Sequence, residues 1–118
     1  MEQRRIFSVT VAVLLMVLLA GCGSDNNTPS APQNLTATAG ASMVTLDWDA
    51  VTDATSYNVY RGLSTGDLSS KALLASALTA TAYADTNVTS GTTYFYQVTA
   101  ESSDGESNGS AEVSATPQ

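Results

Sequence analysis

The stretch that decides the fold is Tyr94-Phe95-Tyr96-Gln97-Val98-Thr99-Ala100, near the end of the chain. Every second residue from Tyr94 to Ala100 has an apolar or aromatic side chain, and a period of two places these side chains on one face of a β-strand. Gly91, just before the stretch, is typical of a turn. The segment therefore predicts a strand with one buried face.

Similar short segments precede and follow this stretch, each bounded by turn residues. The other candidate strands centre on Leu35 and Ala37, on Val44 to Trp48, on Tyr57 to Tyr60, on 72–76, on 79–85 and on Ala111 to Ala115. The two segments between 72 and 85 are weaker, because alanine stands where larger apolar residues are usual. Short alternating strands about ten residues apart are typical of an all-β sandwich. We expect one such domain over residues 32–118.

Four aromatic residues supply most of the predicted core, namely Trp48, Tyr57, Tyr94 and Tyr96. Burial of each side chain would contribute about 2–3 kcal/mol. A tyrosine that points inward also needs a hydrogen-bond partner for its hydroxyl group.

The same segments resemble a known family. Val44-Thr45-Leu46-Asp47-Trp48 followed by Tyr57-Asn58-Val59-Tyr60-Arg61 is similar to the first half of a fibronectin type III domain, and Tyr83 to Thr86 with 91–100 is similar to the second half. The resemblance implies a seven-stranded immunoglobulin-like sandwich, with strands A-B-E in one sheet and C-C′-F-G in the other. It also implies that Trp48 lies in the core and that Tyr94 is the tyrosine corner, with its hydroxyl bonded to backbone in the E–F turn.

The first residues carry a different signal. Arg4 and Arg5 precede an apolar run that ends in Leu19-Ala20-Gly21-Cys22, the chain's only cysteine. A basic start, a short apolar segment and small residues before a cleavage point predict a secretory signal peptide, and the run is shorter than the ~20 residues of a transmembrane helix. The ending resembles the lipobox of bacterial lipoproteins, which implies cleavage before Cys22 and attachment of acyl chains to it. We expect a helical signal peptide over 1–21, the lipidated cysteine and a flexible tether over 22–31, and the domain over 32–118.

Charge and composition limit the function classes. The chain has 11 acidic residues, 4 basic residues and no histidine. An acidic domain is repelled by nucleic acid, so no nucleic-acid partner is expected. The absence of histidine removes the commonest general base and transition-metal ligand, so we expect no enzyme and no cofactor. Calcium is the one metal that the composition permits, with Asp47, Asp49 and Asp53 as the best cluster and Asp104 and Glu106 as the next. Neither cluster has the spacing of a known calcium loop, so no metal site is expected.

Three residues form the candidate binding patch. By alternation Tyr60 and Phe95 point away from the core on neighbouring strands, and Arg61 lies near the strand edge. Such a patch would stack on a sugar ring or dock a protein, although solitary surface aromatic residues are also common. The loops over 62–70 and 102–109 are the next candidates.

The expected function is therefore a lipid-anchored, extracytoplasmic, non-enzymatic binding or scaffolding module of the bacterial envelope, with a protein or glycan partner. In the lipoproteins of enteric-type bacteria that the lipobox resembles, an aspartate after the cysteine tends to hold the protein in the inner membrane. The resemblance, with Gly23 at this position, therefore implies the outer membrane over the inner one. The alternatives are a carbohydrate-binding surface lipoprotein and a purely structural spacer.

Overall fold

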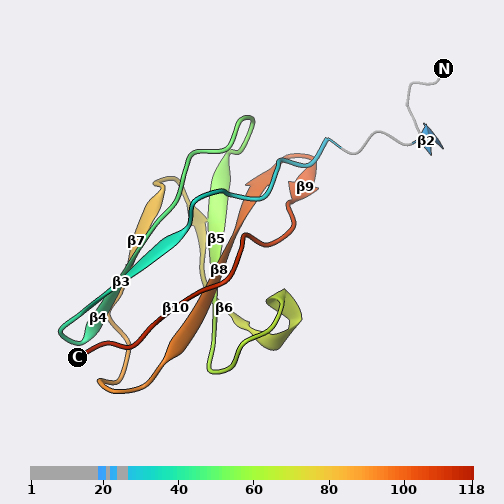
Figure 1. The fold of residues 1–118 in the computed structure, drawn as a ribbon. Coiled ribbons are helices and arrows are strands. Elements are labelled where there is room, and N and C mark those ends of the chain that lie inside the picture. Colours follow the sequence, from blue (N-terminus) through green and yellow to red (C-terminus); the bar gives the residue numbers. More distant parts are fainter. Residues whose placement is uncertain (1–18, 21, 24–26) are drawn as a thin grey trace.

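The computed structural model describes residues 19–20, 22–23 and 27–118 (Figure 1). Before the sandwich, the described residues form two short paired strands, β1 (Leu19–Ala20) and β2 (Cys22–Gly23). The helix expected for the signal peptide lies outside the described residues except at Leu19–Ala20, which form a strand instead. Among the described residues, no helix is long and apolar enough to cross a membrane.

Two antiparallel sheets face one another in the sandwich. The smaller sheet has the order β3-β4-β7, formed by β3 (Thr36–Gly40), β4 (Met43–Asp47) and β7 (Ala82–Asp85). The larger sheet has the order β10-β8-β5-β6, formed by β10 (Val113–Ala115), β8 (Tyr94–Ser102), β5 (Ser56–Gly62) and β6 (Ala72–Leu78), with β9 (Gly105–Glu106) added beside β8. A single 3-10 turn in residues 27–118, η1 (Leu68–Ser70), lies between β5 and β6. This arrangement confirms the predicted sandwich and its A-B-E and C-C′-F-G sheets.

The core lies between the sheets. Its buried members are Leu35, Val44, Leu46, Trp48, Tyr57, Val59, Tyr94, Tyr96, Val98, Ala100 and Ala115. The rings of Trp48 and Tyr57 meet edge to face, with their centroids 5.6 Å apart. The Tyr94 hydroxyl accepts a hydrogen bond from the backbone N–H of Thr89 at 2.8 Å, which is the geometry of a tyrosine corner.

The alanine-rich segment forms two edge strands, β6 and β7. Between β5 and β6 the register shifts, because Tyr57 pairs with Leu78 but Val59 pairs with Ala75. The additional residue is accommodated by a bulge in which Ala77 has a φ of 57°. Small side chains tolerate this bend at a sheet edge.

The two ends of the domain make different contacts. The chain meets the sandwich at Thr28, whose methyl group lies beside Gly105 in the β8–β9 turn, and Pro29 is buried. The packed part thus begins a few residues before residue 32. At the opposite end Gln118 donates its N–H to Gly40 and accepts a bond from Ser42, so the C-terminus is fixed beside the β3–β4 turn (Figure 1).

Candidate binding surface on the outer face of the larger sheet

The strand register places the first two patch residues on the outer face of the larger sheet. Tyr60 on β5 lies opposite Gln97 on β8 and opposite Leu73 on β6. Phe95 lies opposite Gly62. Both aromatic side chains are half-buried, whereas Leu73 is 55% exposed.

Tyr60 belongs to a polar cluster centred on Glu106 of β9. The Tyr60 hydroxyl donates to Glu106 Oε2, and the same oxygen accepts bonds from Thr99 Oγ1 at 2.6 Å and Asn58 Nδ2 at 3.2 Å. The Asn58 amide also donates to Glu101 Oε1 at 3.1 Å. Glu101 and Glu106 are directly opposite each other across β8 and β9, so two carboxylates stand side by side on this face.

Hydrogen bonding fixes the protonation of this cluster. Burial and the bond to Glu106 raise the pKa of Tyr60 to about 12, so its hydroxyl stays protonated and remains a donor. Burial alone would raise the pKa of Glu106, but the bonds from Thr99, Tyr60 and Asn58 lower it. Glu106 is therefore an ionised acceptor held in place by three donors.

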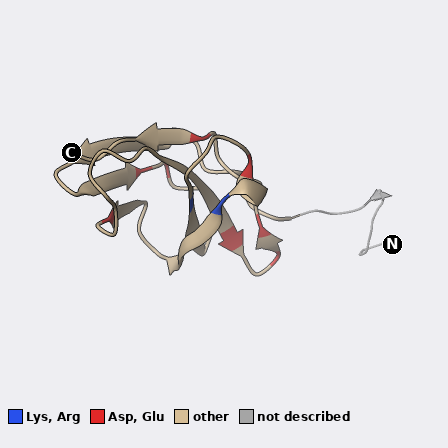
Figure 2. Cartoon of the chain, turned by 90° about the horizontal axis from the view of Figure 1, so that it is seen from below, with Lys and Arg blue, Asp and Glu red and all other residues tan. Residues whose placement is uncertain are grey.

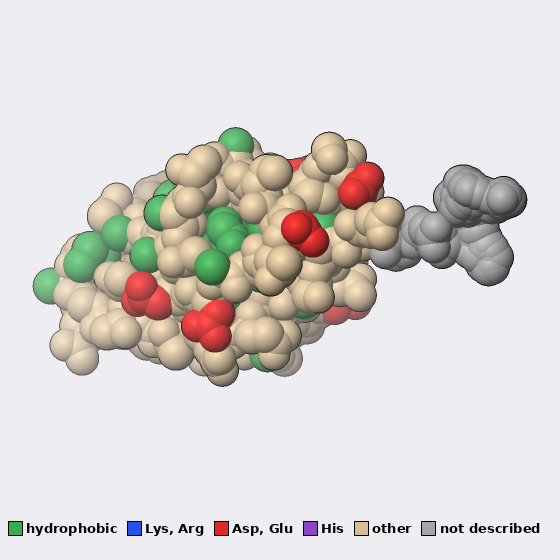
Figure 3. Space-filling view, turned by 90° about the horizontal axis from the view of Figure 1, so that it is seen from above, with side chains coloured by type: hydrophobic (Ala, Val, Ile, Leu, Met, Phe, Trp, Pro, Cys, Tyr) green, Lys and Arg blue, Asp and Glu red, His purple; other side chains and the backbone are tan. Residues whose placement is uncertain are grey.

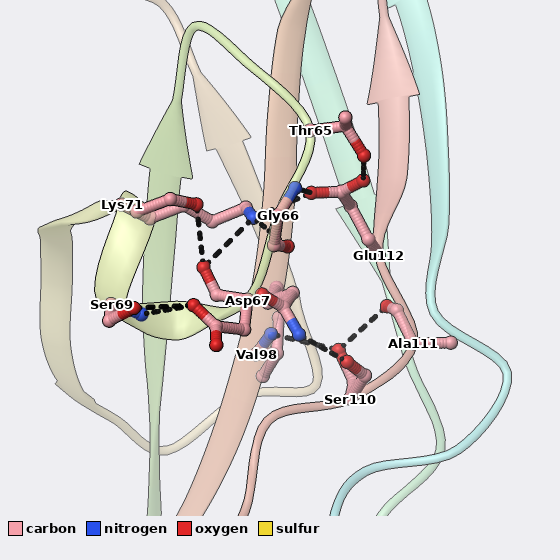
Figure 4. A network of polar contacts seen from close by, with 11 residues as sticks. Thr65, Gly66, Asp67, Ser69, Lys71, Val98, Ser110, Ala111 and Glu112 are labelled. Carbon is pink, nitrogen blue, oxygen red and sulfur yellow. Dashed lines mark hydrogen bonds and ion pairs between the residues drawn. The ribbon is translucent and has the colours of Figure 1, made fainter.

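A second cluster holds the β5–β6 loop, residues 63–71, against the strand β10 side of the sheet (Figure 4). The Lys71 side chain is 0% exposed, and its Nζ lies 2.6 Å from Glu112 Oε2 and 2.7 Å from the carbonyl oxygen of Gly66. Glu112 also accepts bonds from Thr65 Oγ1 at 2.6 Å and Gly66 N at 3.0 Å. The bond to Lys71 is the main reason why the pKa of Glu112 is lowered. One ionised carboxylate thus fastens the whole loop.

This loop lies close to the part of the sheet that carries Phe95. A Cβ at Gly62, opposite Phe95, would lie 3.0 Å from Lys71 Cγ, so the lysine stem crosses the sheet there. A Cβ at Gly109 would lie 2.9 Å from Leu68 Cγ and 2.9 Å from Gln97 Nε2. The loop therefore lies close to Gly62, which is opposite Phe95, and close to Gly109, which Gln97 also approaches.

Arg61 lies on the other face of β5. Its Nη1 is 2.9 Å from Asp85 Oδ2 on β7 and 2.9 Å from the carbonyl oxygen of Asn87, and its guanidinium stands 5.0 Å from the centre of the Tyr94 ring. Asp85 also accepts a bond from the Tyr96 hydroxyl at 2.8 Å. Burial, followed by this bond, raises the pKa of Tyr96. Arg61 therefore contacts residues between the two sheets, and it does not share a face with Tyr60 and Phe95.

The two ion pairs leave the surface of the domain acidic. Residues 27–118 contain nine acidic residues but only two basic ones, Arg61 and Lys71, and both basic side chains are paired internally. Figure 2 shows the two basic residues near the middle of the sandwich and the acidic ones around it, and no basic side chain is visible on the face in Figure 3.

The remaining acidic residues do not form a metal site. In residues 27–118, no group of three or more His, Cys, Asp or Glu side chains could hold a metal ion. Asp49 instead accepts a bond from Asn34 Nδ2 at 2.7 Å. Asp53 and Asp104 line an open polar depression of about 510 Å³ near Thr28.

Two features of this surface were not predicted from the sequence. Glu106 and Glu112 lie 46 and 41 residues from Tyr60 and Lys71, respectively, and no local pattern links them. The one sequence feature that could have indicated the ion pair with Glu112 is Lys71, the single lysine of an acidic chain.

These features define a small immunoglobulin-like β-sandwich module. A family model described as "Fibronectin type III domain SaeA third domain" matches residues 32–118. The chain belongs to the fibronectin type III family.

Relatives of known type carry this domain as a small part of a longer chain. An amylopullulanase of Thermoanaerobacter thermohydrosulfuricus is 41% identical over 102 residues, covering 86% of this chain and 7% of the enzyme. A poly(3-hydroxybutyrate) depolymerase of Ralstonia pickettii is 46% identical over 102 residues, covering 84% of this chain and 19% of the enzyme. Among solved structures, a Fn3-like protein from Clostridium thermocellum is 35% identical with a TM-score of 0.67, covering 76% of this chain and 95% of that one.

Proposed function

We propose that this chain is a lipid-anchored, extracytoplasmic and non-enzymatic binding or scaffolding module of a bacterial envelope. The observation that carries the proposal is the family match. Enzymes of two unrelated types, an amylopullulanase and a poly(3-hydroxybutyrate) depolymerase, contain a similar segment as 7% and 19% of their length. A domain that recurs beside such different activities is best explained as an accessory module.

The anchor is supported by the sequence. Leu19-Ala20-Gly21-Cys22 has the order of a lipobox, and more than one acyl chain is needed for stable attachment. Residues 22–27 would lead from the lipid to Thr28, a reach of about 20 Å when extended. The β8–β9 turn would then face the membrane, and the β3–β4 turn with Gln118 would face away from it. Gly23 after the cysteine favours the outer membrane.

The anchor is tested by metabolic labelling with palmitate in a bacterium that processes lipoproteins. The wild type should incorporate label and sediment with membranes, whereas Cys22→Ser should do neither. Serine keeps the size of the side chain but removes the thiol that would be acylated. Equal labelling of the two proteins would refute the anchor.

The scaffolding role is tested by site-specific photo-crosslinking of the lipidated protein in intact cells. A reproducible adduct with one envelope protein from a probe near Gln118 supports a binding role. The absence of adducts from probes over the whole surface would favour the spacer alternative.

A further inference from the structure

We infer that Asn108 is a site of spontaneous deamidation, in which its side-chain amide is lost through a cyclic imide formed with Gly109. The inference goes beyond the proposed function, because it depends neither on the lipid anchor nor on a binding partner. Every other asparagine in the chain is followed by a residue with a side chain, whereas Asn108 is followed by a glycine. Glycine leaves room for the ring to close and allows the backbone a wide choice of conformations.

Asn108 and Gly109 lie in a bulge beside β8. The segment that follows β9 is bonded to β8 at two points, Ser107 N–H to the carbonyl oxygen of Ala100 at 2.8 Å and Ser110 N–H to that of Val98 at 2.9 Å (Figure 4). The segment over 107–110 therefore takes three steps where β8 takes two. The additional residue leaves the backbone between the two serines outside the ladder of hydrogen bonds.

The two groups that must react have no competing hydrogen bonds. Asn108 is exposed, and neither its side-chain amide nor the N–H of Gly109 forms a hydrogen bond within residues 27–118. Two other asparagine side chains are held in place, since Asn34 Nδ2 donates to Asp49 and Asn58 is buried and donates to several acceptors. The amide of Asn108 is therefore free to turn toward the next backbone nitrogen.

The reaction needs water and no other reagent. The Gly109 nitrogen gives up its proton and attacks Cγ of Asn108, which forms an N–Cγ bond. The bond between Cγ and Nδ2 then breaks, and ammonia leaves. Water opens the imide in one of two ways. Cleavage of the N–Cγ bond yields aspartate, whereas cleavage between the same nitrogen and the main-chain carbonyl carbon yields isoaspartate, whose backbone runs through Cγ.

The modification changes the packing of the β5–β6 loop. The backbone of Gly109 lies so close to Leu68 and Gln97 that a side chain at this position would meet both. Isoaspartate adds one carbon atom to the main chain beside this contact, and close-packed groups do not absorb an extra methylene without moving. Formation of isoaspartate should therefore loosen Leu68 and the loop that carries it.

The test is incubation of the full-length protein, purified from membranes in detergent, in neutral and in mildly alkaline buffer. A protease that cleaves after glutamate then releases the peptide over 107–112 for mass spectrometry. We expect its mass to rise by the difference between an amide and an acid, and to rise faster in the alkaline buffer, because the attacking nitrogen must lose its proton. An isoaspartyl methyltransferase should transfer a methyl group to the same peptide.

Asn108→Gln is the matched control, because glutamine keeps the amide but would have to close a larger, less favourable ring. The peptide over 107–112 from this variant should keep its mass during the incubation. Chymotrypsin should cleave the incubated wild type in the β5–β6 loop, at Leu63 or Leu68, several-fold faster than the fresh protein. The incubated variant should resist chymotrypsin as the fresh protein does, and melting curves of both fresh proteins confirm that they fold alike.

A synthetic peptide with the sequence of residues 104–113 supplies the rate without a fold. Exposed turns open at almost no cost in free energy, so the folded protein should deamidate within about tenfold of the rate of this peptide. A slower reaction than this in the folded protein would overturn the inference, as would equal conversion at Asn34. Deamidation at Asn108 with unchanged cleavage of the loop would overturn the effect assigned to isoaspartate.

Discussion

Removal of the Asp85 carboxylate should be the most damaging polar substitution in this domain. Asp85 is 1% exposed and satisfies three donors from different parts of the chain: Arg61 Nη1 at 2.9 Å, the Tyr96 hydroxyl at 2.8 Å and the Asn87 N–H at 3.2 Å. Asp85→Ala would leave Arg61 without its partner and the Tyr96 hydroxyl buried without an acceptor.

The size of the effect follows from these contacts. Breaking a buried ion pair by removing one partner costs about 3–5 kcal/mol, because the other charge stays desolvated. Domains of this size are stable by only about 5–15 kcal/mol, and each kcal/mol corresponds to about 4–8 °C in melting temperature. Asp85→Ala should therefore lower the melting temperature by more than about 12 °C, or prevent folding.

Thermal unfolding followed by circular dichroism measures this shift, with Asp47→Ala as the control. Asp47 lies in the same sheet, is exposed and makes no side-chain bond within the described residues. The double variant Asp85→Leu with Arg61→Met should be less damaged than the sum of the two single changes, because it leaves no unpaired charge. If Asp85→Ala melts within about 2 °C of Asp47→Ala, the reasoning about this ion pair is wrong.

Four further outcomes are expected. Trp48→Ala should cost about 3–5 kcal/mol by leaving a cavity between the sheets, as measured by urea unfolding, and a shift of under about 1 kcal/mol would contradict its place in the core. Tyr94→Phe should lower the melting temperature by several degrees because Thr89 N–H loses its acceptor, whereas the matched change Tyr83→Phe should not. Glu112→Ala should expose the β5–β6 loop to limited proteolysis while the sandwich still unfolds cooperatively, and cleavage no faster than in the wild type would refute the clamp. Stability should fall as the pH drops below about 4.5, because the folded state lowers the pKa of Glu106, and Glu106→Gln should remove part of this loss in chemical unfolding at pH 3–6.

The sequence alone determined the class of fold and most of its core. A period of two is a local property of the chain, and a strand with one apolar face must cover that face with another sheet, so the alternation over 94–100 and 44–48 identified the buried residues. The sequence did not predict three features, namely the contact of Thr28 with the domain, the bulge at Ala77 and the short strand β9. They depend on contacts that form only when the strands and turns are packed together.

Tertiary structure decided the make-up of the candidate surface. Alternation placed Tyr60 and Phe95 outward, and Arg61 was grouped with them because it lies near the strand edge. Alternation says nothing of what lies above a strand. The β5–β6 loop lies close to Gly62, opposite Phe95, and Glu106 reaches Tyr60 from a strand 46 residues later. Hydrogen bonds and ion pairs form between side chains that folding brings together, and their partners leave no periodic signal in the sequence. The faces of the strands could therefore be assigned from the residues themselves, whereas the partners of Tyr60, Lys71 and Asp85 were fixed only by the packing of the two sheets and their loops.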